Sequence, residues 1–213
     1  MTTGVSERAI DAVVFDWGGV ITPSPFALVR GMGEDHESDQ VLDLMMGPYD
    51  RDTDHPWHRV ERGELTLAEF GAYVEAETQA RGIVLRKPKQ GLMGEMVARP
   101  EVVAAIRRLR ADGYLTALLT NNARELAPLW RPLLPLDELF DVVIDSSEVG
   151  MRKPDPRIYH LALGRLGVDP ARAVFLDDAP GNVAGAAAVG MLAILVSDDF
   201  MAALAELDQL LLA

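Results

Sequence analysis

Two acidic positions stand where they could do chemistry, because each directly follows a short apolar run. Asp16 follows residues 13–15, and Asp177-Asp178 follow residues 173–176. A short apolar run that ends in turn residues predicts a buried parallel strand. In open α/β sheets, ligands bind at the carboxyl ends of the strands. Carboxylates gathered there could hold a hard divalent cation such as Mg²⁺ or act as a nucleophile. The plainer alternative is that these residues only cap the turns that follow.

Three further residues have side chains that complement such carboxylates. Thr120 and Asn121 follow the mostly apolar run 114–119, and Lys153 lies in a Met-Arg-Lys-Pro sequence at 151–154. A hydroxyl, an amide and an ammonium suit the oxygens of a phosphate group. Together with a carboxylate nucleophile and Mg²⁺, they predict phosphoryl transfer through an aspartyl-phosphate. The alternatives are an ordinary strand end at Thr120-Asn121 and a solvated loop residue at Lys153.

These side chains meet at one edge of a sheet only if the strands are parallel, and the order of the elements favours that arrangement. Strands are predicted at residues 13–15, 114–119, 140–144, 173–176 and 192–196, with helices between the later ones. Alternating strands and helices indicate an α/β fold with a doubly wound, Rossmann-like parallel sheet. Residues 24–92 instead have a helical pattern, with a capping box at Thr66 and Glu69. We therefore predict an α/β core of residues 1–23 and 93–213 and a helical cap of residues 24–92.

The chain resembles the haloacid dehalogenase (HAD) superfamily, in particular phosphatase-like members with a helical cap after the first strand. Four stretches carry the resemblance in order: residues 15–20 around Asp16, 119–121, 151–155 and 175–182. Residues 62–66 are similar to the cap of the phosphatase domain joined to mammalian epoxide hydrolase. The resemblance implies a hydrolase, specifically a Mg²⁺-dependent phosphatase that acts on a small phosphorylated metabolite.

The resemblance also implies roles for individual residues. Asp16 matches the family's nucleophile, and Thr120 with Asn121 matches its phosphate-binding motif. Lys153 matches the residue that neutralises the charges of nucleophile and phosphate. The metal site would comprise Asp16, the backbone carbonyl of Gly18, Asp177 and Asp178, with Asp178 the more direct ligand.

One position departs from the family's pattern. Most of its phosphatases carry a second Asp two residues after the nucleophile, where this chain has Gly18. That Asp protonates the leaving oxygen and later activates water, so its absence puts the strength of catalysis in question. A cap residue such as His55 or His58 could supply the proton, although both are interpreted primarily as cap-loop residues. Lys87 and Lys89 are interpreted as solvated charges near the return to the core.

Two other functions stay open on the sequence alone. The first is a metal-independent dehalogenase that uses the same Asp16. The paired Asp177-Asp178 argues against it, because a site without a metal gains nothing from more anions around its nucleophile. The second is a catalytically weak domain that binds a phosphometabolite or a protein, which Gly18 keeps possible. Chelator-sensitive phosphate release, halide release and binding without turnover distinguish the three.

Composition narrows the range of partners. A net charge of −13 over 213 residues argues against nucleic-acid binding, which needs a basic face. The chain has no cysteine, which excludes disulfides and thiolate chemistry. We expect no membrane span, because no apolar run approaches the ~20 residues that one requires, and a cytoplasmic location follows as the default expectation. The expected assembly is a monomer or a homodimer.

Overall fold

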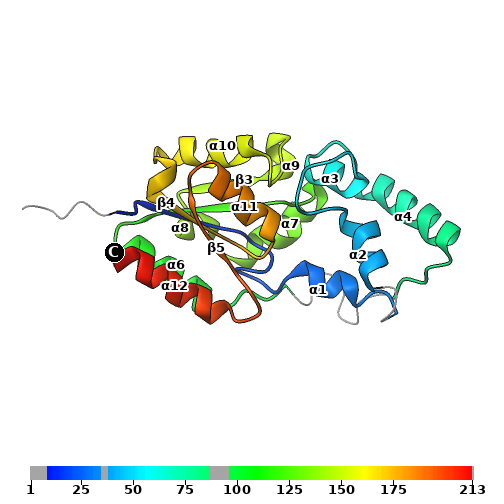
Figure 1. The fold of residues 1–213 in the computed structure, drawn as a ribbon, viewed down its shortest axis with the longest axis horizontal. Coiled ribbons are helices and arrows are strands. Elements are labelled where there is room, and N and C mark those ends of the chain that lie inside the picture. Colours follow the sequence, from blue (N-terminus) through cyan, green and yellow to red (C-terminus); the bar gives the residue numbers. More distant parts are fainter. Residues whose placement is uncertain (1–8, 35–37, 87–95, 213) are drawn as a thin grey trace, which may run out of the picture.

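The computed structural model describes residues 9–34, 38–86 and 96–212, and within them one sheet of parallel strands forms the centre of the fold (Figure 1). The strand order is β3-β2-β1-β4-β5. The strands are β1 (Ala12–Phe15), β2 (Leu115–Thr120), β3 (Val142–Asp145), β4 (Ala173–Asp177) and β5 (Leu192–Leu195). All four residues of β1 are buried, because the strand lies mid-sheet between β2 and β4. Burial on both faces explains why its sequence is continuously apolar.

Helices cover both faces of the sheet, and alternate strand residues divide between them. Val13 and Phe15 pack into a cluster with α6 (Pro100–Ala111) and α12 (Phe200–Leu212). Val14 packs into the other cluster, with α10 (Pro156–Leu166) and α11 (Pro180–Ala188). This alternation is the period of two expected of a strand. The predicted doubly wound parallel sheet is therefore confirmed.

Short elements complete the connections around the sheet. They are the helices α7 (Ala127–Trp130), α8 (Leu136–Leu139) and α9 (Ser146–Val149), with 3₁₀ turns at Arg124–Leu126, Arg131–Leu133 and Pro170–Arg172. The connection after β2 is thus a 3₁₀ turn followed by the single turn α7. Pro128 and Pro132 lack the backbone donor that a longer helix needs.

The segment between β1 and α6 is helical in its described parts, as predicted. It contains α1 (Pro25–Arg30), α2 (Ser38–Met46), α3 (Pro56–Glu61) and α4 (Leu67–Arg81), which lie together at one end of the molecule (Figure 1). The predicted capping box is present at the start of α4, with Thr66 and Glu69 bonded reciprocally. The exact limits of the cap stay a prediction, and its second boundary, Lys87 and Lys89 lie outside the described residues.

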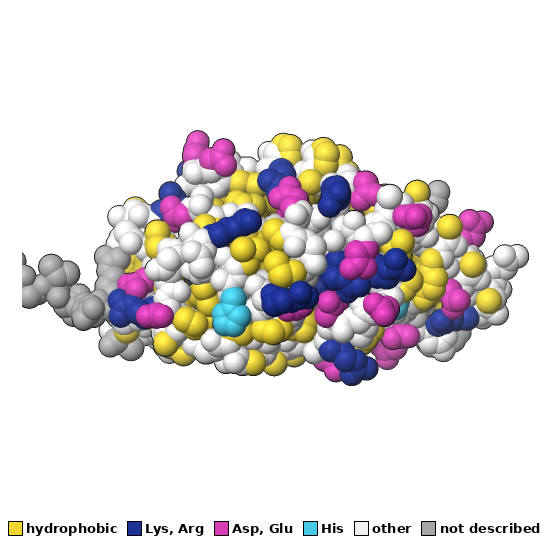
Figure 2. All heavy atoms as spheres, turned by 90° about the horizontal axis from the view of Figure 1, so that it is seen from above, with side chains coloured by type: hydrophobic (Ala, Val, Ile, Leu, Met, Phe, Trp, Pro, Cys, Tyr) yellow, Lys and Arg dark blue, Asp and Glu magenta, His cyan; other side chains and the backbone are white. Residues whose placement is uncertain are grey.

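Charged side chains of both signs are interspersed over the face drawn in Figure 2. Exposed ion pairs of this kind include Arg59–Glu64 at 3.3 Å and Arg131–Glu148 at 2.8 Å. Such exposed pairs contribute little to stability, so the apolar clusters on the two sheet faces must supply most of it. None of the described helices is both long and apolar enough to cross a membrane.

Candidate active site

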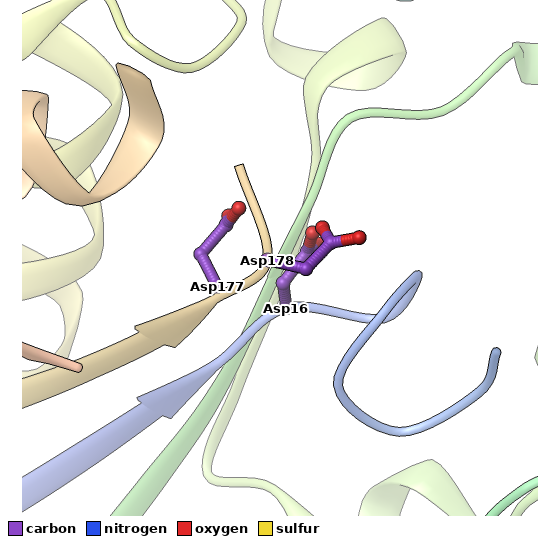
Figure 3. A group of neighbouring side chains, drawn as sticks. All are labelled: Asp16, Asp177 and Asp178. Carbon is purple, nitrogen blue, oxygen red and sulfur yellow. The ribbon is translucent and has the colours of Figure 1, made fainter. Parts of the chain in front are cut away.

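The carboxylates predicted from the sequence converge at the carboxyl edge of the sheet. Phe15 of β1 pairs with Leu176 of β4, so Asp16 and Asp177 leave their strands side by side. Figure 3 shows Asp16, Asp177 and Asp178 with their carboxylates beyond these strand ends. One oxygen from each of the three lies within 4.8 Å of the others.

Lys153 lies between two of these carboxylates. Its Nζ is 2.8 Å from Asp16 Oδ1 and 2.6 Å from Asp177 Oδ2, and the side chain is fully buried. Burial opposes the positive charge, but the two carboxylates raise the pKa of Lys153 above its ordinary value. The ammonium is therefore a permanent positive charge beside Asp16.

Asn121 holds the backbone of Lys153. Its Oδ1 accepts the Lys153 N–H at 2.8 Å, and its Nδ2 donates to the Lys153 carbonyl at 3.0 Å. The amide that the sequence suggested for phosphate binding thus positions the lysine segment. Thr120 ends β2 and is buried, and its hydroxyl donates to the Asn121 carbonyl at 3.5 Å. That long contact leaves the hydroxyl weakly engaged.

The two oxygens of Asp16 have different surroundings. Oδ1 accepts hydrogen bonds from the Trp17 N–H at 2.7 Å and from Lys153. Oδ2 accepts none from the described residues. One oxygen is therefore fixed in place, while the other is available for a ligand or for chemistry.

Asp177 and Asp178 also differ in how fully they are engaged. Asp177 is buried and accepts hydrogen bonds from the Ala179 N–H at 2.8 Å and from Asn182 Nδ2 at 3.1 Å to both of its oxygens. Asp178 is partly exposed, and the side-chain hydrogen bond that it accepts within the described part of the chain comes from Ser24 Oγ at 2.5 Å. No role was predicted for Asn182 or Ser24. The contact of Asn182 could have been predicted, because Asn182 lies in the first helical turn after Asp177. No local sequence pattern indicates the contact between Ser24 and Asp178.

The charge of the cluster fits a divalent cation. Burial raises the pKa of Asp16 well above its ordinary range in spite of Lys153, and the other two carboxylates add to that rise. Burial, with the charge of Asp177, raises the pKa of Asp178 to about 6. When all three carboxylates are ionised, they and the one ammonium carry two negative charges in excess, and a bound cation offsets the repulsion that raises these pKa values. Carboxylate oxygens are the donors that Mg²⁺ prefers, so the residues present fit that ion.

The two glycines after Asp16 serve different purposes. Gly19 has φ of 78°, and a Cβ there would lie 2.0 Å from the Asp178 Cγ. Only glycine both adopts that conformation readily and lets the loop pass so close to Asp178. Gly18 lies outside the left-handed region, and a Cβ there would contact the Pro25 Cδ at 3.0 Å. A side chain at position 18 is therefore crowded by one ring but not forbidden by the backbone.

A cavity of about 550 Å³ lies between the acidic cluster and the cap, and Asp178 is the member of the cluster that lines it. Gly19, Phe26 of α1, Tyr49 and Arg99 also line this cavity. The Phe26 and Tyr49 rings pack edge to face at 4.7 Å. Concave sites with apolar walls and a few convergent polar groups are typical of small-molecule binding.

Neither histidine considered as a proton donor lines this cavity. His55 caps α3, where its Nδ1 accepts the Trp57 N–H at 3.2 Å. His58 is fully buried: its Nδ1 accepts the Thr53 N–H at 3.1 Å, and its Nε2 lies 3.1 Å from the Met46 carbonyl. Because Nδ1 is an acceptor, the ring proton lies on Nε2 and His58 is neutral. Both side chains are thus engaged in the structure of the cap.

Relatives identified by sequence include phosphatases and dehalogenases. Acyl-CoA dehydrogenase family member 10 of mouse is 37% identical over 212 residues, covering 96% of this chain and 19% of that protein. Mouse bifunctional epoxide hydrolase 2 is 29% identical, covering 94% and 39%. The chain therefore spans well under half the length of either. The sesquiterpene phosphatase astK of Aspergillus oryzae is 26% identical, covering 93% and 95%. An (S)-2-haloacid dehalogenase 4A of Burkholderia cepacia is 24% identical, covering 89% and 84%.

Solved structures share the fold. A HAD-like hydrolase of Porphyromonas gingivalis matches with a TM-score of 0.65 and 24% identity, covering 94% of this chain and 98% of that one. A HAD family enzyme of Bacteroides thetaiotaomicron, solved with magnesium and inorganic phosphate, matches with a TM-score of 0.57 and 18% identity, covering 87% and 93%. A family model of haloacid dehalogenase-like hydrolases matches residues 10–190. Since that model spans most of the sequence, including every predicted motif, the chain belongs to the haloacid dehalogenase-like hydrolase family.

Proposed function

We propose that this hydrolase is a Mg²⁺-dependent phosphatase that acts on small phosphomonoesters through a phosphorylated Asp16. The observation that carries the proposal is the acidic cluster, in which oxygens of three carboxylates lie within 4.8 Å of one another and two of the carboxylates contact Lys153. A nucleophile that worked without a metal would gain nothing from two more anions beside it. Relatives that include a full-length phosphatase support the same reaction.

The groups that we assign to the metal are Asp16, the Gly18 carbonyl, Asp177 and Asp178, of which Asp178 would be the most direct ligand. A Mg²⁺ ion held there would supply positive charge to the phosphoryl group and offset the excess negative charge of the carboxylates. The Thr120 hydroxyl and the Lys153 ammonium bind the remaining phosphoryl oxygens. Asn121 contributes by holding the Lys153 backbone, as its two hydrogen bonds indicate.

In the first step Asp16 Oδ2, the oxygen that accepts no hydrogen bond from the described residues, attacks phosphorus. A bond forms between this oxygen and phosphorus while the bond from phosphorus to the ester oxygen breaks. The leaving alkoxide or phenoxide takes a proton from water, because position 18 carries no carboxyl group to donate one. In the second step water attacks phosphorus, the bond to Asp16 breaks, and inorganic phosphate leaves with the carboxylate restored.

The decisive experiment measures phosphate release from an aryl phosphate with Mg²⁺ and with excess chelator. We expect turnover that disappears on chelation and in Asp16→Asn, since an amide cannot attack phosphorus as a carboxylate does. Asp137→Asn, on the exposed surface of α8, is the matched control and should keep wild-type turnover. Activity retained by folded Asp16→Asn contradicts the covalent mechanism. Halide release that is insensitive to chelator would instead establish the dehalogenase. Binding of a phosphorylated metabolite without turnover would establish the catalytically weak binding domain.

A further inference from the structure

Arg152 directly precedes Lys153 in the core, yet its guanidinium donates hydrogen bonds to residues of the cap. Its Nε lies 2.7 Å from Oε2 of Glu61, the last residue of α3. Both side chains are buried, at 0% and 1% exposure. An ion pair across 91 positions of sequence thus joins the residue beside Lys153 to a cap helix.

The cap surrounds this guanidinium on several sides. The Tyr49 hydroxyl donates to Glu61 Oε1 at 2.6 Å, and the Tyr49 ring stacks against Arg152 at 4.9 Å. Arg152 Nη1 lies 3.4 Å from the Arg51 carbonyl and 3.6 Å from Asp52 Oδ1. The same loop lies directly on α11, because a Cβ on Gly181 would come within 2.2 Å of the Tyr49 carbonyl.

Stability alone is a poor reason for burying this pair. Removing two charges from water costs about as much as their attraction returns, and apolar residues of similar volume often stabilise a protein more. Arg152 Nη2 is in addition buried without a hydrogen-bond partner among the described residues, which adds an unsatisfied donor. A costly arrangement beside a reactive residue indicates a role in placing that residue.

Lys153 is held from both sides. From the core, Asn121 bonds both its N–H and its carbonyl. From the cap, Glu61 fixes the residue immediately before it. We propose that Glu61 and Arg152 are positioning residues: docking of α3 through this pair sets the Lys153 ammonium between Asp16 and Asp177. The site is then complete only when the cap is docked. This inference rests on the proposed function for its kinetic consequence, but the position of Lys153 can be tested without it.

The first test is amine acetylation followed by mass spectrometry, which reads the burial of Lys153 without any turnover. The chain has only three lysines, so labelling of Lys153 is normalised to that of Lys87 and Lys89. In Glu61→Gln we expect Lys153 labelling to rise by about 10-fold, because local opening exposes a buried amine. The matched control is Glu125→Gln, which also removes a carboxylate between cap and core. Glu125 accepts the Leu67 N–H at 3.0 Å in an exposed hydrogen bond that does not involve Arg152 or Lys153, so its replacement should change labelling by less than about 2-fold.

The second test is steady-state kinetics on the same proteins. Misplacing a catalytic group by about 1 Å costs up to ~100-fold in rate, so Glu61→Gln should lower kcat by about 10-fold or more with KM nearly constant. Arg152→Lys, which keeps the charge, should retain more kcat and more protection of Lys153 than Arg152→Gln. A merely structural role would instead reduce the folded fraction and leave the kcat of folded protein unchanged.

Equal labelling and equal kcat in Glu61→Gln and Glu125→Gln overturn the inference, as does wild-type protection of Lys153 in Arg152→Gln. If Glu61→Gln does not fold, Tyr49→Phe removes one hydrogen bond from Glu61 and should raise Lys153 labelling by about 3-fold. No rise in folded Tyr49→Phe would also count against the pair. If wild type releases no phosphate from any ester, the proposed function fails while the labelling result still decides the inference.

Discussion

At the scale of single residues, the carboxylates of the site differ in how many protein donors already occupy them. Asp177 is bonded by Lys153, Ala179 and Asn182, so it is part of the buried framework. Asp178 has Ser24 as its side-chain partner and lines the cavity. Neighbouring residues of the same type therefore differ in their contacts: Asp177 is bonded to the lysine and the strand end, while Asp178 lines the cavity.

This difference predicts opposite effects for two alanine substitutions. Asp178→Ala should weaken Mg²⁺ binding by about 10-fold more than Asp177→Ala does, since it removes the more accessible ligand. Asp177→Ala should cost about 2 kcal/mol or more of unfolding free energy, because buried donors on Ala179 and Asn182 lose their acceptor. Calorimetric titration with Mg²⁺ and denaturant unfolding measure the two quantities. A reversed order of Mg²⁺ affinities means that the roles of the pair are exchanged.

Gly18 leads to a prediction about leaving groups. A general acid contributes about 10²–10⁴-fold to a rate. Its absence lowers the rate least for substrates with good leaving groups, which need little protonation. Wild type should therefore cleave aryl phosphates measurably and simple alkyl phosphates poorly. Gly18→Asp should narrow the aryl-to-alkyl ratio of kcat/KM, because the backbone at position 18 accepts a side chain.

The control is Gly18→Ala, which adds the same Cβ against Pro25 without a carboxyl group. It should lose a little thermal stability and leave the aryl-to-alkyl ratio unchanged. If wild type already hydrolyses alkyl phosphates as fast as aryl ones, another group supplies the proton and Gly18 is no handicap.

At the scale of elements, α3 joins the cap to the lysine segment of the core. This helix has His55 as its N-cap residue, begins at Pro56 and ends at Glu61. His58 lies between them, bonded to Thr53 and Met46 from two other cap segments. A short helix has little stability of its own, so these tertiary contacts determine whether α3 keeps Glu61 in place.

The state of His58 makes the cap sensitive to acid. Burial, reinforced by the charge of Arg152 and by His55, lowers its pKa from 6.5 to about 3. Asp52 lies 3.7 Å from its Nδ1, and Arg62 also lowers the pKa. Between pH 6.5 and about 3 the unfolded chain binds a proton that the folded chain rejects. This contribution to stability is therefore complete above pH 6.5 and falls by up to about 1.4 kcal/mol per pH unit below it.

The measurement is the pH dependence of unfolding free energy in wild type and in His58→Gln. Glutamine can still accept from Thr53 and donate to Met46, but it does not titrate. We expect the variant to be less stable near neutral pH and to have a shallower acid slope. Identical slopes below pH 6.5 show that His58 charges as readily in the folded state as in the unfolded one.

At the scale of the whole molecule, the features that depend on local sequence could be predicted, whereas those that depend on contacts between distant residues could not. Asp16 could be placed at a strand end because a continuous apolar run precedes it, and Thr66 could be identified as a cap from residues within one turn. The Ser24–Asp178 contact crosses 154 positions and the Glu61–Arg152 pair crosses 91, so no local pattern indicates them. Asn121 was predicted from its motif to bind phosphate. Its hydrogen bonds to the Lys153 backbone could not be predicted, because they depend on the relative positions of two loops.

The described contacts between cap and core are both apolar and polar. Val60 and Phe70 of the cap pack with Ala123 of the core, and the polar contacts include Glu61–Arg152, the Ser24–Asp178 hydrogen bond and the Leu67 N–H bond to Glu125. Polar contacts of this kind can break and reform as two bodies separate, whereas a packed apolar interface resists such motion. Exchange of substrate and product through the cavity at Asp178 would require the polar contact beside it, Ser24–Asp178, to open.

We therefore predict that ligand binding closes the cap on the core. Hydrogen exchange with Mg²⁺ and orthovanadate should slow at the entry linker of residues 22–24 and at the cap loop of residues 47–55, compared with the free protein. Closure excludes water from the phosphoryl site and completes the pocket, as in other enzymes with mobile lids. Vanadate with chelator in place of Mg²⁺ is the control and should protect neither segment. The central strand β1 should exchange slowly in every sample, since its amides are bonded on both sides. Protection that stays confined to the strand ends around Asp16 and Asp177 would establish a site that works with the cap in one fixed position.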